Sequence, residues 1–166
     1  RDIIGLGLNE AMQVLFPEQA PARRADLVER YRRHFLELDT TGMPLFPGVT
    51  QGLTRLAQQG YLLAIATGKA RRGLDRVLDE TGMRHLFASS RCADEAFSKP
   101  HPRMLEDILD QTGVDAGRAL MVGDTVYDME MARSAKVAGL GVSYGVHARE
   151  RLLDCGALAC LDSFPE

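Results

Sequence analysis

The sequence predicts an α/β fold built on a doubly wound parallel sheet. Short apolar runs alternate with amphipathic stretches of about ten residues from position 44 onward, which is typical of strands joined by crossover helices. Several of these runs are continuously apolar, which indicates strands covered on both faces. Ligands of such sheets bind beyond the carboxyl ends of the strands. The residues that follow each strand are therefore the first candidates for a functional site.

Each element of this core is expected from a local pattern. Helices are expected where apolar residues recur at spacings of three and four, and glycines at positions 60 and 82 mark the ends of two of them. Strands are expected at the short apolar runs. The expected helices span 49–59, 70–81, 102–112, 127–136 and 149–153, and the expected strands span 61–66, 87–92, 119–122, part of 139–145, and 159–161.

The first part of the chain differs from this core. Residues 1–43 are predicted to be helical. The stretch GMPLFPGV (42–49) follows, and its two prolines and two glycines indicate a linker or hinge. We therefore expect two units, a helical segment over 1–43 and an α/β core over 44–166.

The composition is that of an ordinary globular protein. Of the 166 residues, 45% are hydrophobic and 26% are charged, and the net charge of −3 gives no general attraction to nucleic acid or to an anionic membrane. No apolar run is long enough to cross a bilayer. Three scattered cysteines indicate free thiols in a reducing compartment, so we expect a cytoplasmic protein.

Polar residues follow three of the expected strands. They are Thr67, Gly68 and Lys69 after 61–66, Lys99 after 87–92, and Asp124 and Asp128 after 119–122. Most have a structural alternative, because Thr67 or Asp124 can cap a helix. Lys69 and Lys99 can be surface charges. Asp128 is harder to explain in this way, since two carboxylates four residues apart on one helix repel each other and a bound Mg²⁺ would remove that cost.

The chemistry of these groups fits phosphoryl transfer. A transferring phosphoryl group needs hydrogen-bond donors, a cation and a metal ion around its charged oxygens. Thr67, Lys99 and a Mg²⁺ ion at Asp124 would supply them. No Asp, Ser or Cys follows another strand at this edge, so a nucleophile is missing from the set.

The stretches that carry these residues resemble motifs of the haloacid dehalogenase superfamily. LFPGVTQGLTRLAQQGYLLAIATGKA (45–70) is similar to the entry into the core and the second motif, FSKPHPRML (97–105) to the third, and LMVGDTVYDMEMARSAKVAGLGVSYG (120–145) to the fourth. The likeness is closer to the phosphoglycolate-phosphatase-like branch, which has a Rossmann-like core and a helical cap. Residues 1–43 resemble the later part of that cap.

The resemblance implies roles for the candidate residues. Thr67 and Lys99 would hold the phosphoryl group as catalytic residues, with Gly68 and Lys69 as further phosphate-binding positions. Asp124 would ligate Mg²⁺ directly, and Asp128 would support it through water or hydrogen bonds.

One motif of the family is absent from the sequence. It is an apolar strand followed by Asp-x-Asp-Gly-Thr, which supplies the nucleophile and would lie upstream of Arg1. We therefore interpret the chain as a fragment that is inactive alone. In the family this strand lies mid-sheet, between the strands that end at Thr67 and Asp124, so its loss would leave two unpaired edges prone to self-association.

The expected function is that of a Mg²⁺-dependent phosphatase. The parent protein would hydrolyse small-molecule phosphate monoesters through an aspartyl-phosphate, with phosphoglycolate, sugar phosphates and nucleotides all open as substrates. The main alternative is a degenerate relative that binds phosphate or a partner without catalysis. A phospho-acceptor signalling domain fits less well because its acidic pair comes early in the chain, and a dehalogenase fits less well because Lys99 and the acidic pair suit phosphoryl transfer.

Overall fold

The computed structural model describes residues 2–34 and 44–164. The order of helices and strands predicted for the core is confirmed. The elements are α1 (Leu8–Leu15), α2 (Pro21–Arg33), α3 (Val49–Gln58), β1 (Leu63–Thr67), α4 (Arg71–Thr81), η2 (Arg84–Leu86), β2 (Phe87–Cys92), α5 (Arg103–Thr112), η3 (Ala116–Arg118), β3 (Leu120–Gly123), α6 (Val126–Ser134), β4 (Ala138–Val142), α7 (Arg149–Asp154) and β5 (Cys160–Leu161).

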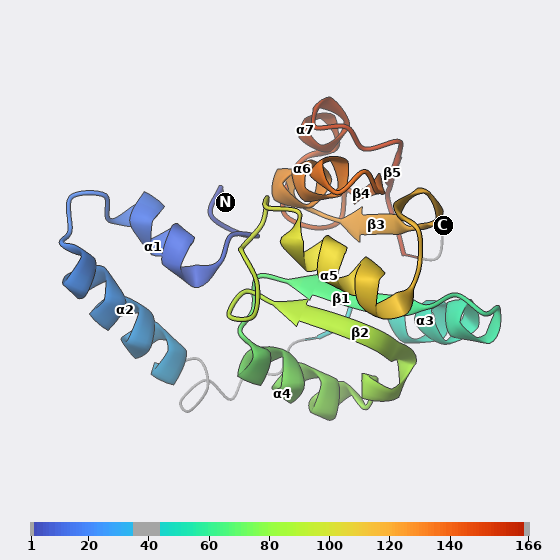
Figure 1. The fold of residues 1–166 in the computed structure, drawn as a ribbon, viewed down its shortest axis with the longest axis horizontal. Helices are drawn as coiled ribbons and strands as arrows, with labels where there is room; N and C mark the ends of the chain where they lie inside the picture. The colour runs from blue at the N-terminus through green and yellow to red at the C-terminus, as the bar shows by residue number, and fades with distance from the viewer. Residues whose placement is uncertain (1, 35–43, 165–166) are drawn as a thin grey trace.

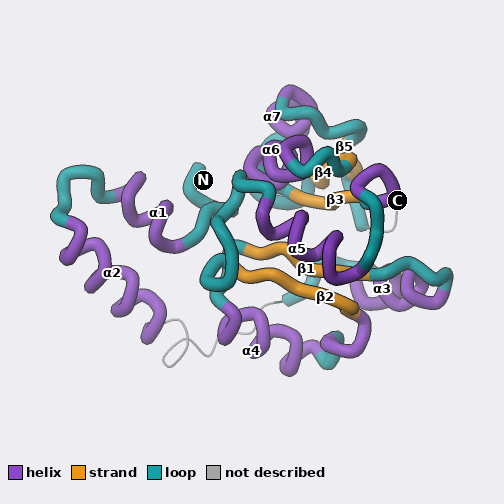
Figure 2. Tube along the Cα trace, in the orientation of Figure 1, coloured by secondary structure: helices purple, strands orange, loops and turns teal. Residues whose placement is uncertain are grey.

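All strand pairs are parallel, as the alternating pattern predicts, but within the described residues they form two sheets and not one. One sheet has the order β1-β2 and the other has the order β3-β4-β5. The ends of paired strands lie at the same level, since Thr67 is opposite Cys92, the last residue of β2, and Gly123 is opposite Gly141, the next-to-last residue of β4. Helix α5 contacts β1 and β2, and α6 contacts β3 and β4 (Figure 2). The loops after the strands therefore gather at one end of the molecule.

An unpaired strand position separates the two sheets. Within the described residues, β1 pairs only with β2, and β3 pairs only with β4. Leu120 and Val122 on β3 are 55% and 48% exposed, which is unusual for apolar residues of a central strand. The unpaired edges expected from the missing motif are therefore present in the structure.

The main core lies between α5 and α6. Met104 and Met131 are fully buried there and pack with neighbours from both helices. Ala66 of β1 and Met121 of β3 contact the same apolar cluster, so the two sheets share one core although no ladder joins them. Full burial of one such side chain contributes about 1.5–3 kcal/mol.

The amino-terminal helices lie to one side of the sheets. Helices α1 and α2, drawn in blue, pack against each other and extend away from the strands (Figure 1). Residues 2–7 are not helical, although helix was predicted throughout 1–43. They pass close to the core, because a Cβ atom placed on Gly68 would lie 2.9 Å from the Leu6 carbonyl oxygen. Part of the predicted linker, residues 42 and 43, lies outside the described residues.

No helix in the described ranges combines the length and the apolar character needed to cross a membrane.

Candidate active site

Thr67 ends strand β1 at the edge where the loops gather. Its hydroxyl oxygen accepts a hydrogen bond from the backbone N–H of Lys69 at 3.1 Å. The alternative that Thr67 caps a helix is wrong, since the N-cap of α4 is Ala70. Thr67 therefore closes a tight turn over residues 67–69, and all three of these residues line the cavity at this edge.

Lys99 is held in a buried ion pair. The side chain is 8% exposed, and its Nζ donates to Oδ1 of Asp128 at 2.6 Å. The alternative of a solvated loop lysine is therefore wrong. A buried charge of this kind persists only where a partner compensates for the loss of water. The contact joins the loop after β2 to the start of α6 and fixes the ammonium group at the sheet edge.

Asp128 is fully engaged by neighbours in the protein. Its second oxygen, Oδ2, accepts from the backbone N–H of Thr125 at 3.1 Å and from the Thr125 hydroxyl at 2.7 Å. The Thr125 hydroxyl in turn accepts from the N–H of Asp128, so the two residues form a capping box. A Cβ atom on Gly123 would overlap the Asp128 side chain, which explains the glycine at the end of β3.

The relation between Asp124 and Asp128 differs from the prediction. Helix α6 begins at Val126 with Thr125 as its N-cap, so Asp124 lies in the preceding turn and not one helical turn before Asp128. Neither the repulsion of two carboxylates on one helix nor a capping role of Asp124 applies. The sequence signal for the true cap was the pattern TVYD, a Thr followed three residues later by an acid.

Asp124 is cradled by the loop that follows β4. Its Oδ2 accepts from the backbone N–H of Val146 at 3.0 Å, and its carbonyl oxygen accepts from the N–H of His147 at 3.1 Å. A Cβ atom on Gly145 would overlap the Asp124 side chain. Residues 143–147 were not predicted as part of the site, because part of this stretch was assigned to the strand within 139–145. The glycine at 145 was the available signal.

His147 also contacts the turn between β3 and α6. It is 3% exposed, and its Nδ1 accepts from the backbone N–H of Val126 at 3.0 Å. This contact requires Nδ1 to be unprotonated, so the neutral ring carries its proton on Nε2. His147 thereby satisfies an N–H group at the start of α6, next to the cap residue.

The acidic residues suit part of a Mg²⁺ site. A carboxylate offers about four acceptor positions, so Asp124 retains capacity for a metal ion beside Val146. Both oxygens of Asp128 already have protein partners, which suits a supporting role better than direct ligation. No group of three or more His, Cys, Asp or Glu side chains in the described ranges is placed to hold a metal. Further ligands would have to come from outside this set.

Lys69 lies two residues after Thr67, in the turn that follows β1. Burial lowers the pKa of its ammonium group, because the charged form loses water. Its carbonyl oxygen accepts from the N–H of Ala93 at 3.0 Å, which joins the turn after β1 to the turn after β2. The alternative of a fully solvated surface lysine therefore does not fit Lys69, which is partly buried.

The turns after β1 and β2 are also joined by hydrogen bonds from Arg71 to Asp94 and Glu95, which we call the Arg71–Glu95 bracket. Arg71 donates to both carboxylate oxygens of Glu95 at 2.7 and 2.8 Å, and its backbone N–H donates to Asp94 at 2.9 Å. The hydrogen bonds with Glu95 raise the pKa of Arg71 and lower the pKa of Glu95. Burial raises the pKa of the neighbouring Cys92 thiol to about 11, so this thiol stays protonated and is no nucleophile near neutral pH.

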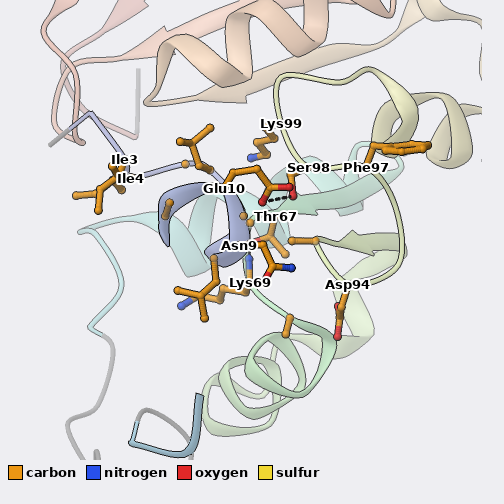
Figure 3. Close-up of a pocket in the computed structure, with 18 of the residues that line it drawn as sticks. Ile3, Ile4, Asn9, Glu10, Thr67, Lys69, Asp94, Phe97, Ser98 and Lys99 are labelled. Carbon is orange, nitrogen blue, oxygen red and sulfur yellow. Dashed lines mark hydrogen bonds between the residues drawn. The ribbon is translucent and has the colours of Figure 1, made fainter. Parts of the chain in front are cut away.

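One cavity of about 1120 Å³ brings the predicted residues together (Figure 3). The predicted site residues that line it are Thr67, Gly68, Lys69, Lys99, Asp124 and Asp128. Residues that were not predicted also contribute, notably Glu10 of α1 and Ser98, whose hydroxyl donates to Glu10 at 3.1 Å. The cavity thus lies between the carboxyl edge of the sheets and the amino-terminal helices.

The chain is similar in sequence and in fold to known proteins. A family model described as haloacid dehalogenase-like hydrolase matches residues 1–142. The chain is 36% identical to the probable phosphatase IndB of Dickeya dadantii over 170 residues, which cover 100% of this chain and 74% of that protein. It is 35% identical to a phosphoglycolate phosphatase of Agrobacterium fabrum over 72% of this chain and 52% of the relative. A phosphoglycolate phosphatase of Mesorhizobium japonicum is 36% identical over 79% of this chain and 62% of the relative.

The chain thus spans about half to two thirds of the two phosphoglycolate phosphatases that it matches. Among solved structures, a predicted phosphatase from Clostridium acetobutylicum has a TM-score of 0.84 at 20% identity, covering 97% of this chain and 74% of that one. A predicted phosphoglycolate phosphatase from Haemophilus somnus has a TM-score of 0.78 at 25% identity, covering 95% and 70%. The fold, the ordered motifs and these relatives agree that the chain belongs to the haloacid dehalogenase-like hydrolases.

Proposed function

We propose that this chain carries the phosphoryl- and metal-binding part of a Mg²⁺-dependent phosphatase of the phosphoglycolate-phosphatase-like branch. The observation that carries the proposal is the buried Lys99–Asp128 ion pair, which lies in one cavity with Thr67 and Asp124. An ammonium group fixed in this way, next to a hydroxyl and a carboxylate, is the arrangement that binds a phosphoryl group beside a metal ion.

Each residue has a distinct part in the proposed reaction. Lys99 binds a phosphoryl oxygen, and Asp128 and Thr125 hold Lys99 in position. The Thr67 hydroxyl and the N–H groups of its turn donate to the other phosphoryl oxygens. Asp124 holds Mg²⁺, which when bound neutralises charge on the phosphoryl oxygens.

The proposed nucleophile is a carboxylate at the end of a strand between β1 and β3. Within the described residues no strand pairs with the second edge of β1 or of β3, so such a strand could lie there. A carboxylate oxygen at this position would attack phosphorus and the bond to the ester oxygen would break, and the leaving alkoxide would take its proton from the second acidic residue of the same Asp-x-Asp motif, acting as general acid. Water would then hydrolyse the aspartyl-phosphate and release inorganic phosphate.

Hydrolysis of p-nitrophenyl phosphate tests this division of labour. Residues 1–166 alone should show no Mg²⁺-dependent turnover. A synthetic peptide with an apolar strand followed by Asp-x-Asp-Gly-Thr should restore turnover that EDTA abolishes, and the same peptide with Asn at the first acidic position should not. Appreciable metal-dependent turnover by the chain alone would contradict the proposed origin of the nucleophile.

Binding tests the preformed half of the site without turnover. Calorimetric titration of residues 1–166 should show weak Mg²⁺ binding, and Asp124→Asn should abolish it because a neutral amide is a poorer ligand for a hard cation. Inorganic phosphate should bind to the wild type and lose most of its affinity in Lys99→Met. An Mg²⁺ affinity unchanged by Asp124→Asn would remove the metal assignment.

The second candidate is a non-catalytic member of the family that binds phosphate or a partner. It ranks second because Thr67, Lys99 and Asp124, which the phosphatase would need, are all present. Natural sequence upstream of Arg1 discriminates the two, since an apolar run followed by Asp-x-Asp supports the phosphatase.

We also propose that residues 1–166 self-associate through the unpaired edges of β1 and β3, because exposed apolar edges template strand pairing. Light scattering at rising concentration tests this, and a sharp monomer at micromolar concentration would contradict it.

A further inference from the structure

We propose that Glu10 selects the leaving group of the substrate, favouring phosphate monoesters of hydroxylated alcohols over those that carry a carboxylate. This inference rests on the proposed phosphatase function and concerns the same cavity. It assigns a role to the wall that α1 contributes, opposite the sheet edge.

Glu10 faces the site from the amino-terminal helices. Its Oε2 accepts a hydrogen bond from the hydroxyl of Ser98, the residue directly before Lys99 (Figure 3). A Cβ atom on Gly7 would overlap both side chains, so the glycine permits this close approach. Glu10 is thereby held at the cavity next to the proposed phosphoryl-binding lysine, on the side that a leaving group would occupy.

Glu10 is the cavity acid that α1 contributes, and like Asp94 and Asp124 it forms no ion pair within the described ranges. The other acids of the wall have their own partners: Glu95 pairs with Arg71, Asp107 with Arg91 and Arg103, Asp128 with Lys99, and Asp94 and Asp124 accept backbone N–H groups. Glu10 forms no ion pair with any residue of the described ranges, and Ser98 satisfies only part of its acceptor capacity. Its carboxylate therefore keeps acceptor capacity for a ligand in the cavity.

The charge pattern of the wall discriminates among leaving groups. A carboxylate on the leaving group would meet the like charge of Glu10. An ammonium group would meet Lys69, which lines the same cavity. A hydroxyl group is compatible with both, because it can donate to Glu10 and accept from a lysine. Asn9, beside Glu10 on α1, adds an amide that also donates and accepts.

This preference separates the chain from the activity named for several relatives. Phosphoglycolate has a carboxylate one carbon from its ester oxygen, and that group would lie toward Glu10 when the phosphoryl group is at Lys99. The inference therefore predicts that phosphoglycolate is a poorer ligand here than an ester whose leaving group carries hydroxyls.

A matched pair of ligands isolates the effect. Glycerol 3-phosphate and 3-phosphoglycerate differ in one terminal group, a hydroxymethyl in the first and a carboxylate in the second. Calorimetry on residues 1–166 with Mg²⁺ should give about tenfold tighter binding of glycerol 3-phosphate, and Glu10→Gln should bring the two affinities close to equal. Inorganic phosphate serves as the reference, and each variant is checked for folding by circular dichroism.

Two control variants exclude simpler explanations. Glu18→Gln removes the same charge at an exposed turn between α1 and α2 and should leave the affinity ratio of the two ligands unchanged. Ser98→Ala removes the hydrogen bond to Glu10 but keeps its charge, so it should also preserve the preference for glycerol 3-phosphate.

Three results would overturn the inference. The first is an affinity ratio that Glu10→Gln does not change. The second is an equal weakening of all three ligands by Glu10→Gln and by Ser98→Ala, since this would mean that the contact only closes the helices over the core. The third is a failure of inorganic phosphate itself to bind, which would overturn the proposed function as well, whereas the first two leave that function standing.

Discussion

The two walls of the cavity differ in how firmly their polar groups are held. On the sheet side, the Lys99–Asp128 pair is buried, and Thr125 saturates the remaining oxygen of the carboxylate. On the helix side, a single hydrogen bond from Ser98 holds the partly exposed Glu10. The difference fits a division in which the sheet edge supplies fixed groups for the shared chemistry and the helices supply an adjustable wall for specificity.

Breaking the buried pair should have the largest effect. Asp128→Ala leaves the Lys99 ammonium buried without its partner and removes the capping box, so unfolding free energy should fall by about 3–5 kcal/mol. Urea denaturation monitored by circular dichroism measures the change.

Asp110→Ala, an exposed acid on α5, is the control and should change stability by less than about 0.5 kcal/mol. The double variant Lys99→Met with Asp128→Leu should recover much of the loss, because no unpaired charge remains. A cost below about 1 kcal/mol for Asp128→Ala would show that the pair does not compensate a buried charge.

Gly145→Ala, also on the sheet side of the cavity, should lower the unfolding free energy by less than Asp128→Ala does. The new methyl group would overlap Asp124 at its Cβ, close to the backbone, so the strain cannot be relieved by a simple rotation. We expect a cost of about 1–3 kcal/mol and a weakened Mg²⁺ affinity, measured by urea denaturation and calorimetry. Gly117→Ala is the matched control, since a Cβ at that glycine meets open space. If both variants had the same unfolding free energy and the same Mg²⁺ affinity, the loop around Gly145 would not be needed to hold Asp124.

The corresponding substitution on the helix side of the cavity, Gly7→Ala, should lower the unfolding free energy by less than Gly145→Ala does. A methyl group in Gly7→Ala would overlap the Ser98 hydroxyl and the Glu10 carboxylate, which are the ends of side chains that can rotate away. We expect about 1 kcal/mol or less in stability, with a reduced preference between glycerol 3-phosphate and 3-phosphoglycerate. A cost equal to that of Gly145→Ala would show that both walls are equally rigid, and the comparison between them would fail.

The same contrast explains what the sequence could predict. Thr67 ends β1, and Lys99 and Asp124 come after β2 and β3. Parallel strands end at one edge, so the meeting of these residues follows from the alternation of strands and helices alone. The Thr125–Asp128 capping box was within reach of sequence patterns but was missed, because the sequence was interpreted as two carboxylates on one helical face and not as a Thr cap followed three residues later by its acidic partner.

The helix wall was beyond such reasoning. The Ser98–Glu10 hydrogen bond joins residues 88 positions apart, and both partners are common polar residues without a repeating pattern. The Gly145 loop was missed for a related reason. Gly145 has no functional side chain, and its role is to leave room for the side chain of Asp124. Contacts of this kind depend on tertiary packing, which local patterns do not encode.

The smallest expected effect concerns the bracket that joins the turns after β1 and β2. Hydrogen bonds from Arg71 lower the pKa of Glu95 below its ordinary value of 4.5, so the folded protein binds this proton more weakly than the unfolded chain. The stabilisation is therefore complete above the unfolded pKa and is lost as the pH falls through the lower folded value. Because Glu95 is about one third exposed, we expect only about 0.5–1 kcal/mol.

Unfolding free energies in urea between about pH 3 and pH 6 measure this contribution. The wild type should lose stability on acidification more steeply than Glu95→Gln, while the exposed Glu18→Gln should follow the wild type. Parallel curves for the wild type and Glu95→Gln would show that the bracket adds nothing to stability. The turn that carries Lys69 would then be held only by its backbone hydrogen bond to Ala93, and the sheet side of the cavity would be less rigid than its hydrogen bonds indicate.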